Sequence, residues 1–141
     1  MTKRIIITGA SSGIGEALAY ELASQGNHLA LCARREEELK DLCGKLKDKY
    51  PNGEFIWETL DVSQLDQVGP TIHKLKDRLG GLDTLVANAG VVGVRATGSG
   101  ELDKDQWIFN VNLMGAIATI DAAAAIFKEQ KHGHLVGISS F

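Results

Sequence analysis

The sequence predicts an α/β fold built on a doubly wound parallel sheet. Two observations support this prediction: short apolar runs alternate with segments of helical periodicity, and the apolar runs are continuous rather than broken by polar residues. Strands that are buried on both faces have this composition, and parallel strands need helical crossovers between them. Right-handed crossovers then favour a doubly wound sheet, which binds its ligands at the carboxyl ends of the strands.

Five strands are expected, each at a short apolar run between turn signals, which is typical of a buried strand. They cover residues 3–8, 29–33, 54–60, 82–87 and 135–139. The first strand ends in a glycine-rich turn, and the last follows a His-Gly-His turn. This spacing leaves room for one helix between each pair of consecutive strands.

Four helices are expected where apolar residues recur every three or four positions. They cover residues 14–26, a stretch around 39–46, residues 65–79 and residues 102–130. Gly26 closes the first helix, as glycine commonly does. Pro70 falls within the first turns of the third helix, where proline is tolerated.

Composition indicates one soluble domain covering residues 1–141. The chain has 44% hydrophobic and 23% charged residues and a net charge of -3, so no basic surface favours nucleic acid or an anionic membrane. Its first apolar run is too short for a signal peptide or a membrane span. Cys32 and Cys43 are interpreted as small core residues in a reducing cytoplasm, and neither has metal-ligand spacing to a histidine. We expect a cytoplasmic protein without a metal site.

The first turn joins a strand directly to a helix and contains three glycines with the spacing GxxxGxG. Glycines let the backbone approach a pyrophosphate, and the helix amino end offers free N–H groups and a positive dipole. The alternative is a structural turn with Ser12 as a helix cap, which three glycines at this junction disfavour. The expected nucleotide-binding residues of this turn are Thr8, Gly9, Ser11, Ser12, Gly13, Ile14 and Gly15.

With its leading threonine, this turn resembles that of the short-chain dehydrogenase/reductase (SDR) family, which has a Rossmann fold. Further matches follow in order over essentially the whole chain: Asp61-Val62, Asn88-Ala89-Gly90, Val111-Asn112-Leu113-Met114-Gly115 and Ile138-Ser139-Ser140. The resemblance implies a nicotinamide-dependent oxidoreductase of carbonyls and alcohols. It also implies that Asp61 and Val62 hold the adenine and that Asn88, Ala89 and Gly90 line the cofactor. From the residues alone, a helix-capping aspartate and a glycine turn remain alternatives.

The end of the second strand favours NADP(H) over NAD(H). NAD-binding domains usually place an acidic residue here to bind the ribose 2′-hydroxyl, whereas this chain has Arg34 and Arg35 and no acid before Glu36. Guanidinium groups bind a phosphate well, and two arginines at the start of a helix oppose its dipole unless an anion is bound. A solvated run of surface ion pairs is the alternative. Ser12 stands where NADP-binding members of the family often have a basic residue.

Two residues resemble members of the family's catalytic set. Asn112 matches an asparagine that distorts its helix and anchors a proton-relay water, and Ser140 matches a serine that bonds the substrate oxygen. A solvent-facing asparagine, as Asn110 also could be, and serines that simply end a strand are the alternatives. Ser139 is the less favoured neighbour of Ser140.

The tyrosine and lysine of that catalytic set have no match in this sequence. Tyr20 and Tyr50 precede the motifs that they should follow, and neither has a lysine four positions later. We therefore expect the 141 residues to be the cofactor-binding half of a longer enzyme and to be inactive alone. An exposed sheet edge after the fifth strand favours that interpretation. A genuinely short, non-catalytic nucleotide-binding or interaction module is the alternative. The long fourth helix resembles the family's dimer face, so a homo-oligomer is expected.

Overall fold

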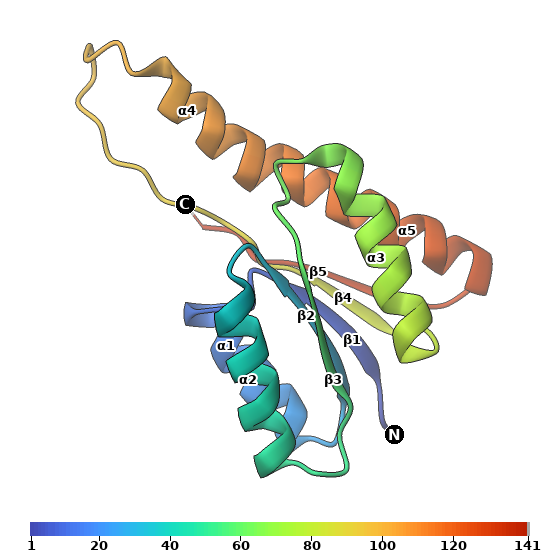
Figure 1. The fold of residues 1–141 in the computed structure, drawn as a ribbon. Coiled ribbons are helices and arrows are strands. Elements are labelled where there is room, and N and C mark those ends of the chain that lie inside the picture. The colour runs from blue at the N-terminus through green and yellow to red at the C-terminus, as the bar shows by residue number, and fades with distance from the viewer. Residues whose placement is uncertain (141) are drawn as a thin grey trace.

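The computed structural model describes residues 1–140 and contains one parallel sheet of five strands (Figure 1). The strands are β1 (Arg4–Thr8), β2 (His28–Ala33), β3 (Phe55–Thr59), β4 (Thr84–Ala87) and β5 (His134–Gly137). Their order in the sheet is β3-β2-β1-β4-β5, and each neighbouring pair is parallel. The predicted doubly wound sheet is confirmed. The winding direction reverses between β1 and β4, which is where such sheets bind their ligands.

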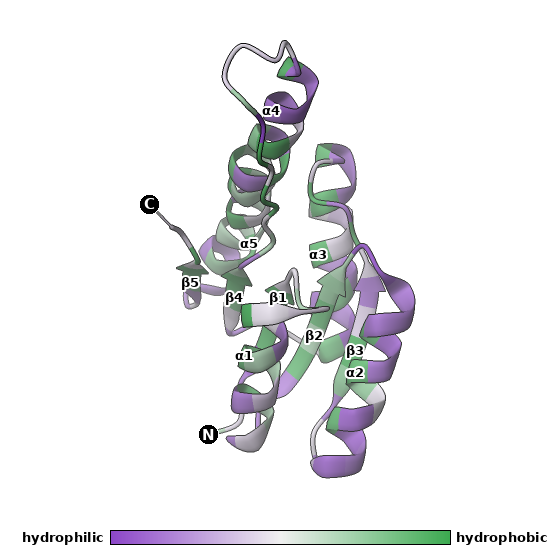
Figure 2. Cartoon of the chain, turned by 90° about the vertical axis from the view of Figure 1, so that its left-hand side faces the viewer, coloured by the Kyte–Doolittle hydropathy of each residue, from purple (hydrophilic) through white to green (hydrophobic). Residues whose placement is uncertain are grey.

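Helices cover both faces of the sheet, as Figures 1 and 2 show. The elements are α1 (Gly13–Ser24), α2 (Glu36–Lys49), α3 (Leu65–Leu79), α4 (Leu102–Phe109) and α5 (Ala116–Gln130). Alternate residues of a strand point to opposite faces. Ile5 and Ile7 of β1 therefore pack with α1 and α2, whereas Ile6 packs with α3 and α5. Burial on both faces explains why the strands are continuously apolar.

The strand ends differ by one or two residues from those that the apolar runs predict, and they differ most at β4 and β5. β4 starts at Thr84 rather than at residue 82, because the Asp83 side chain bonds to Arg4 just before the ladder begins. β5 ends at Gly137, which pairs with Ala87 at the end of β4. A strand at the edge of the sheet can extend only as far as its neighbour, so the ladder stops there.

The helix predicted over residues 102–130 is interrupted at its centre by a π-helical segment, η1 (Asn110–Gly115). Such segments often mark functional sites. Asn112, which lies within this segment, forms hydrogen bonds through its side-chain amide to the backbone of Val91, after β4. At its end, Gly115 packs so closely against Val62 that an added β-carbon would lie 2.6 Å from Val62 Cγ2. Periodicity alone gave no sign of this widened turn, although the family resemblance implied a distortion at Asn112.

By length and composition, the helical stretch Leu102–Gln130 could cross a membrane. In this fold its second half packs on the protein instead: Thr119, Ala123 and Ile126 of α5 are buried against the core. The core helix of a soluble protein can have the same composition, so one such stretch is weak evidence for a membrane span. Within residues 1–140, no group of three or more His, Cys, Asp or Glu side chains could hold a metal ion.

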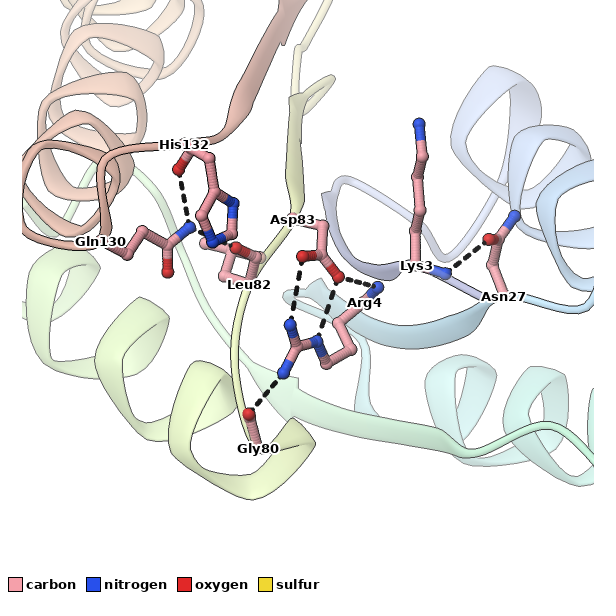
Figure 3. A network of polar contacts seen from close by, with 8 residues as sticks. All are labelled: Lys3, Arg4, Asn27, Gly80, Leu82, Asp83, Gln130 and His132. Atoms are coloured by element: carbon pink, nitrogen blue, oxygen red, sulfur yellow. Dashed lines mark hydrogen bonds and ion pairs between the residues drawn. The ribbon is translucent and has the colours of Figure 1, made fainter. Parts of the chain in front are cut away.

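Polar contacts join the amino ends of the strands, at the edge of the sheet opposite the glycine turn (Figure 3). Asp83 Oδ2 accepts bonds from the backbone N of Arg4 at 2.8 Å and from its Nε at 3.0 Å, and Asp83 Oδ1 accepts from its Nη2 at 3.1 Å. Arg4 Nη1 also donates to the carbonyl oxygen of Gly80. These bonds fix the start of β4 against β1. The hydrogen bonds from Arg4 lower the pKa of Asp83.

We predict that Asp83→Asn lowers the free energy of unfolding by about 1–2 kcal/mol at pH 7, since it removes a charge-assisted pair that is only partly exposed. The folded-state pKa of Asp83 lies below its unfolded value. The contribution of the Asp83 carboxylate to the free energy of unfolding is therefore complete when the pH is above the unfolded-state pKa. It is lost as the pH falls through the folded-state pKa. Urea unfolding of both proteins at pH 7 and at pH 3 measures this.

Asp121→Asn is the matched control, because Asp121 is exposed and forms no ion pair within the described chain. If the difference in the free energy of unfolding between wild type and Asp83→Asn were the same at pH 3 as at pH 7, the stabilisation by Asp83 would not be electrostatic.

Candidate functional site

A groove of about 510 Å³ lies at the carboxyl edge of the sheet, where β1, β2 and β4 end. It brings together most of the residues that the sequence motifs identified. Those residues are Thr8, Gly9, Ser11, Ser12, Gly13, Ile14, Arg34, Arg35, Val62, Asn88, Ala89 and Gly90. Four other predicted residues, Gly15, Asp61, Asn112 and Ser140, do not line it. The groove falls within the usual volume of a site for a drug-sized ligand or cofactor.

Hydrogen bonds between Thr8 and the segment after β4 form the floor of the groove. The buried Thr8 hydroxyl donates to the carbonyl oxygen of Val86 and accepts from the backbone N–H groups of Asn88 and Ala89, at 3.0 and 3.1 Å. The Asn88 amide donates back to the carbonyl oxygens of Thr8 and Gly9, each at 3.1 Å. A hydroxyl and a carboxamide are needed here because only they combine donors and acceptors at this size.

The three glycines of the turn have different roles. Gly9 has φ +65°, and a β-carbon there would lie 2.6 Å from Ala89 Cα. A β-carbon on Gly15 would overlap the carbonyl oxygen of Gly9 and lie 2.6 Å from Asn88 Nδ2. These two glycines therefore allow the turn, α1 and the segment after β4 to pack together. Gly13, by contrast, has φ +57° and nothing within 4 Å of its β-carbon position, so it borders open space at the start of α1.

Helix α1 begins at Gly13 with its amino end at the groove. Ser12 occupies the N-cap position, but its side chain forms no capping hydrogen bond, so the structural interpretation of Ser12 as a helix cap is wrong. The first-turn N–H groups lack intrahelical partners, and the helix dipole is positive at this end. Ile14, 65% exposed, adds an apolar side chain at the same place. This combination suits an anionic group beside a flat ring.

The two arginines after β2 differ in their contacts. Arg35 forms an ion pair with Glu38 at 3.3 Å and donates to Ser11 Oγ at 3.2 Å. Arg34 forms no hydrogen bond or ion pair among residues 1–140; its one recorded side-chain contact is with the ring of Trp107. Arg34 is therefore a groove-lining cation without a carboxylate partner.

The dipole of α2 attracts an anion at this place less than the sequence indicated. Three acidic residues, Glu36, Glu37 and Glu38, occupy the first turn of α2 and already complement its positive end. The missing carboxylate partner of Arg34, rather than the helix dipole, favours an anion here.

One side of the groove is apolar, and the sequence motifs largely missed it. It is lined by Cys32, Ala33, Leu60, Val62, Val91, Val92 and Val111. These residues follow or precede motif positions, so their place at strand ends was the available signal. Burial raises the pKa of the Cys32 thiol to about 12, with a smaller contribution from Glu58, so the thiol is neutral at physiological pH. The expectation that Cys32 and Cys43 are core residues is confirmed by their burial.

Asp61 has a local structural contact. Its Oδ1 accepts hydrogen bonds from the backbone N of Ser63 at 3.0 Å and from Ser63 Oγ at 2.7 Å, which tightens the turn between β3 and α3. Asp61 is half-buried and lies between two residues that line the groove, Leu60 and Val62. It does not cap α3, whose N-cap is Gln64.

Asn112 and Ser140 lie beyond the groove lining, in segments near the end of β4. Asn112 Oδ1 accepts from the backbone N of Val91 at 2.7 Å, and Asn112 Nδ2 donates to the Val91 carbonyl oxygen at 2.8 Å. The π-helix is thus tied to the segment after β4. Ser140 is exposed and follows Ile138, whose backbone N donates to Ala87 at the end of β4.

The two tyrosines pack away from the groove. Tyr20 and Tyr50 lie against the core on the α1 and α2 face, and the Lys49 ammonium lies 5.8 and 5.4 Å from their ring centroids. Neither ring lines the groove. The described residues thus contain no tyrosine in a position to exchange a proton there.

The chain is similar to known oxidoreductases over nearly its whole length. An uncharacterised oxidoreductase of Mycobacterium tuberculosis is 39% identical over 138 residues, which are 98% of this chain and 54% of that protein. An alcohol dehydrogenase of Thermococcus sibiricus, solved with 5-hydroxy-NADP, is 34% identical with a TM-score of 0.88, over 96% of this chain and 57% of the other. A xylitol dehydrogenase solved with NAD⁺ is 27% identical with a TM-score of 0.91, over 98% and 53%. The chain spans about half the length of these relatives.

A family model described as short chain dehydrogenase matches residues 3–141, which is nearly the whole chain. The matched range includes the glycine turn, the Asn88 segment and the π-helix. The chain belongs to the short-chain dehydrogenase family of oxidoreductases.

Proposed function

We propose that this chain supplies the nucleotide-binding part of an NADP(H)-dependent oxidoreductase that interconverts a carbonyl and an alcohol. One observation supports the choice of cofactor above the others: Arg34 lines the groove and has no carboxylate partner within residues 1–140. Similar solved structures hold NADP-type and NAD ligands alike, so family membership does not decide between them.

The groove fits a dinucleotide in both shape and chemistry. Open space at Gly13 and the free N–H groups of α1 suit a pyrophosphate, which has no side chain to displace there. The apolar side, with Val62 and Val111, suits an adenine ring. Arg34, with Arg35 in support, would hold a 2′-phosphate through charge-assisted hydrogen bonds. Asp61 would act at the adenine end.

The bound nicotinamide supplies the hydride that such a reaction needs. Ser140 would donate a hydrogen bond to the substrate oxygen, and Asn112 would support a proton-relay water. The Asn112 amide is bonded to Val91 through both its oxygen and its nitrogen, so it shapes the backbone at the site. A small-molecule substrate, a homo-oligomeric state and a cytoplasmic location complete the proposal. No nucleic acid or membrane partner is part of it.

A non-catalytic nucleotide-binding module is the second candidate, favoured by the packing of Tyr20 and Tyr50 away from the groove. The intact mass of the protein purified from its source, together with a reductase assay on a panel of carbonyls, separates the two. A native protein of the relatives' length with NADPH-dependent turnover supports the oxidoreductase. A native protein of 141 residues that binds NADPH without turnover supports the module.

We predict that NADPH raises the melting temperature of the 141-residue chain. Ligand at 100 times its Kd stabilises a folded protein by about 2.7 kcal/mol. Differential scanning fluorimetry with NADPH, NADH and buffer alone measures the shift. The absence of any shift with both nucleotides would contradict nucleotide binding and would support a plain scaffold.

We predict that Gly13→Ala weakens NADPH binding by about 10-fold or more, or about 1.4 kcal/mol, since a methyl group would occupy the space where a pyrophosphate approaches. Gly26→Ala is the matched control. Gly26 also has positive φ (+81°) and nothing within 4 Å of its β-carbon position, but it follows the other end of α1. Both variants carry similar backbone strain, and only Gly13→Ala should lose affinity in calorimetric titrations. Equal losses in both variants would indicate strain alone.

We predict that Arg34→Ala weakens NADPH binding by about 10- to 100-fold and leaves NADH binding unchanged, because one charged hydrogen-bonding partner is worth about 1.5–3 kcal/mol. Arg35→Ala should cause a smaller loss, since Arg35 already bonds to Glu38 and Ser11. Fluorescence titration with each nucleotide measures the ratio of affinities. If Arg34→Ala left that ratio unchanged, the NADP(H) assignment would be wrong.

A further inference from the structure

Arg34 and Trp107 form a contact between two elements that are distant in sequence. The Arg34 guanidinium carbon lies over the Trp107 ring, 5.7 Å from its centroid. Arg34 follows β2, and Trp107 belongs to α4. The distance is within the range of a cation–π interaction, for which tryptophan is the best aromatic partner.

Trp107 is placed to act at the groove although it does not line it. It precedes Val111 by four residues in the same helical stretch, about one turn away, and Val111 lines the groove. Trp107 is 39% exposed, on a helix that has no buried residue, so its ring is open to contact from Arg34.

The nearest acidic residue on α4 is already paired. Asp105 bonds to Arg95, with Arg95 Nε 2.7 Å from Asp105 Oδ1 and 2.8 Å from Oδ2. That bond lowers the pKa of Asp105, so the carboxylate stays ionised and paired. Arg34 is therefore held at α4 by an aromatic ring and not by a carboxylate.

The difference matters for the chemistry of Arg34. A carboxylate would use the N–H groups at the edge of the guanidinium, as Glu38 uses those of Arg35. An aromatic ring has no carboxylate oxygen to accept those hydrogen bonds, and Arg34 forms no hydrogen bond within residues 1–140, so its N–H donors stay available. Binding to a ring therefore orders the side chain without competing with a phosphate for its donors.

We propose that Trp107 is a positioning residue for 2′-phosphate recognition, holding Arg34 at the groove with its donors free. This inference rests on the proposed function, in which Arg34 binds the phosphate. Trp107 would contribute to the choice between NADP(H) and NAD(H) without touching the phosphate itself.

The test uses two small probes that differ only in the 2′-phosphate, namely 2′,5′-ADP and 5′-AMP, titrated into the 141-residue chain by calorimetry. Trp107→Leu should weaken 2′,5′-ADP binding by about 2- to 5-fold and leave 5′-AMP binding unchanged. Trp107→Phe, which keeps an aromatic ring and is the milder change if leucine impairs folding, should cause a smaller loss. Phe109→Leu is the control, because Phe109 is an exposed aromatic residue of the same helix.

A double-mutant cycle with Arg34→Ala separates positioning from a general structural role. In the Arg34→Ala background, Trp107→Leu should have no further effect on 2′,5′-ADP binding. Equal losses for both probes, or losses that simply add in the cycle, would overturn the inference. If Arg34→Ala reduces the preference for 2′,5′-ADP but Trp107→Leu does not, the inference fails and the proposed function stands. If Arg34→Ala has no effect on that preference, both fail.

Discussion

The hydrogen bonds between Thr8 and the segment after β4 are the constraint on which the rest of the site depends. The Thr8 hydroxyl joins three backbone groups of β4 and its extension, and the Asn88 amide returns two bonds to the turn after β1. These bonds fix the two strand ends at the point where the winding of the sheet reverses. Because these strand ends are fixed, α1 starts close to the segment after β4. The approach is so close that neither Gly9 nor Gly15 could carry a side chain. The open space at Gly13 results from that packing.

The π-helix extends the same arrangement to the other side of the groove. Its Asn112 holds Val91, three residues beyond Asn88, and its Gly115 packs on Val62 after β3. One widened turn therefore contacts the segments that follow two different strands. A regular helix would place these side chains differently, since each added residue per turn rotates the helix face. The distortion thus has a clear structural use in keeping the groove walls together.

The sequence predicted the fold well because its signals were redundant. Continuous apolar runs, apolar residues at helical spacing and a glycine-rich turn all predicted the same parallel sheet. Each strand was located to within a few residues. Local patterns could not reveal features that depend on distant neighbours. Gln64, rather than Asp61, occupies the N-cap position of α3, and the apolar wall with Cys32 and Val111 forms only when strand ends and the π-helix converge. The contact between Arg34 and Trp107 likewise follows from tertiary packing alone.

The Arg4–Asp83 network lies at the amino edge of the sheet, whereas the groove lies at the carboxyl edge. β1 and β4 therefore carry these contacts at their amino ends and the groove at their carboxyl ends. The buried apolar middle separates the two ends. A substitution at one end of these strands therefore has no direct contact with the residues at the other end. A lineage could alter its cofactor preference after β2 while its folding determinants stayed the same, and it could adapt to a new temperature without disturbing recognition.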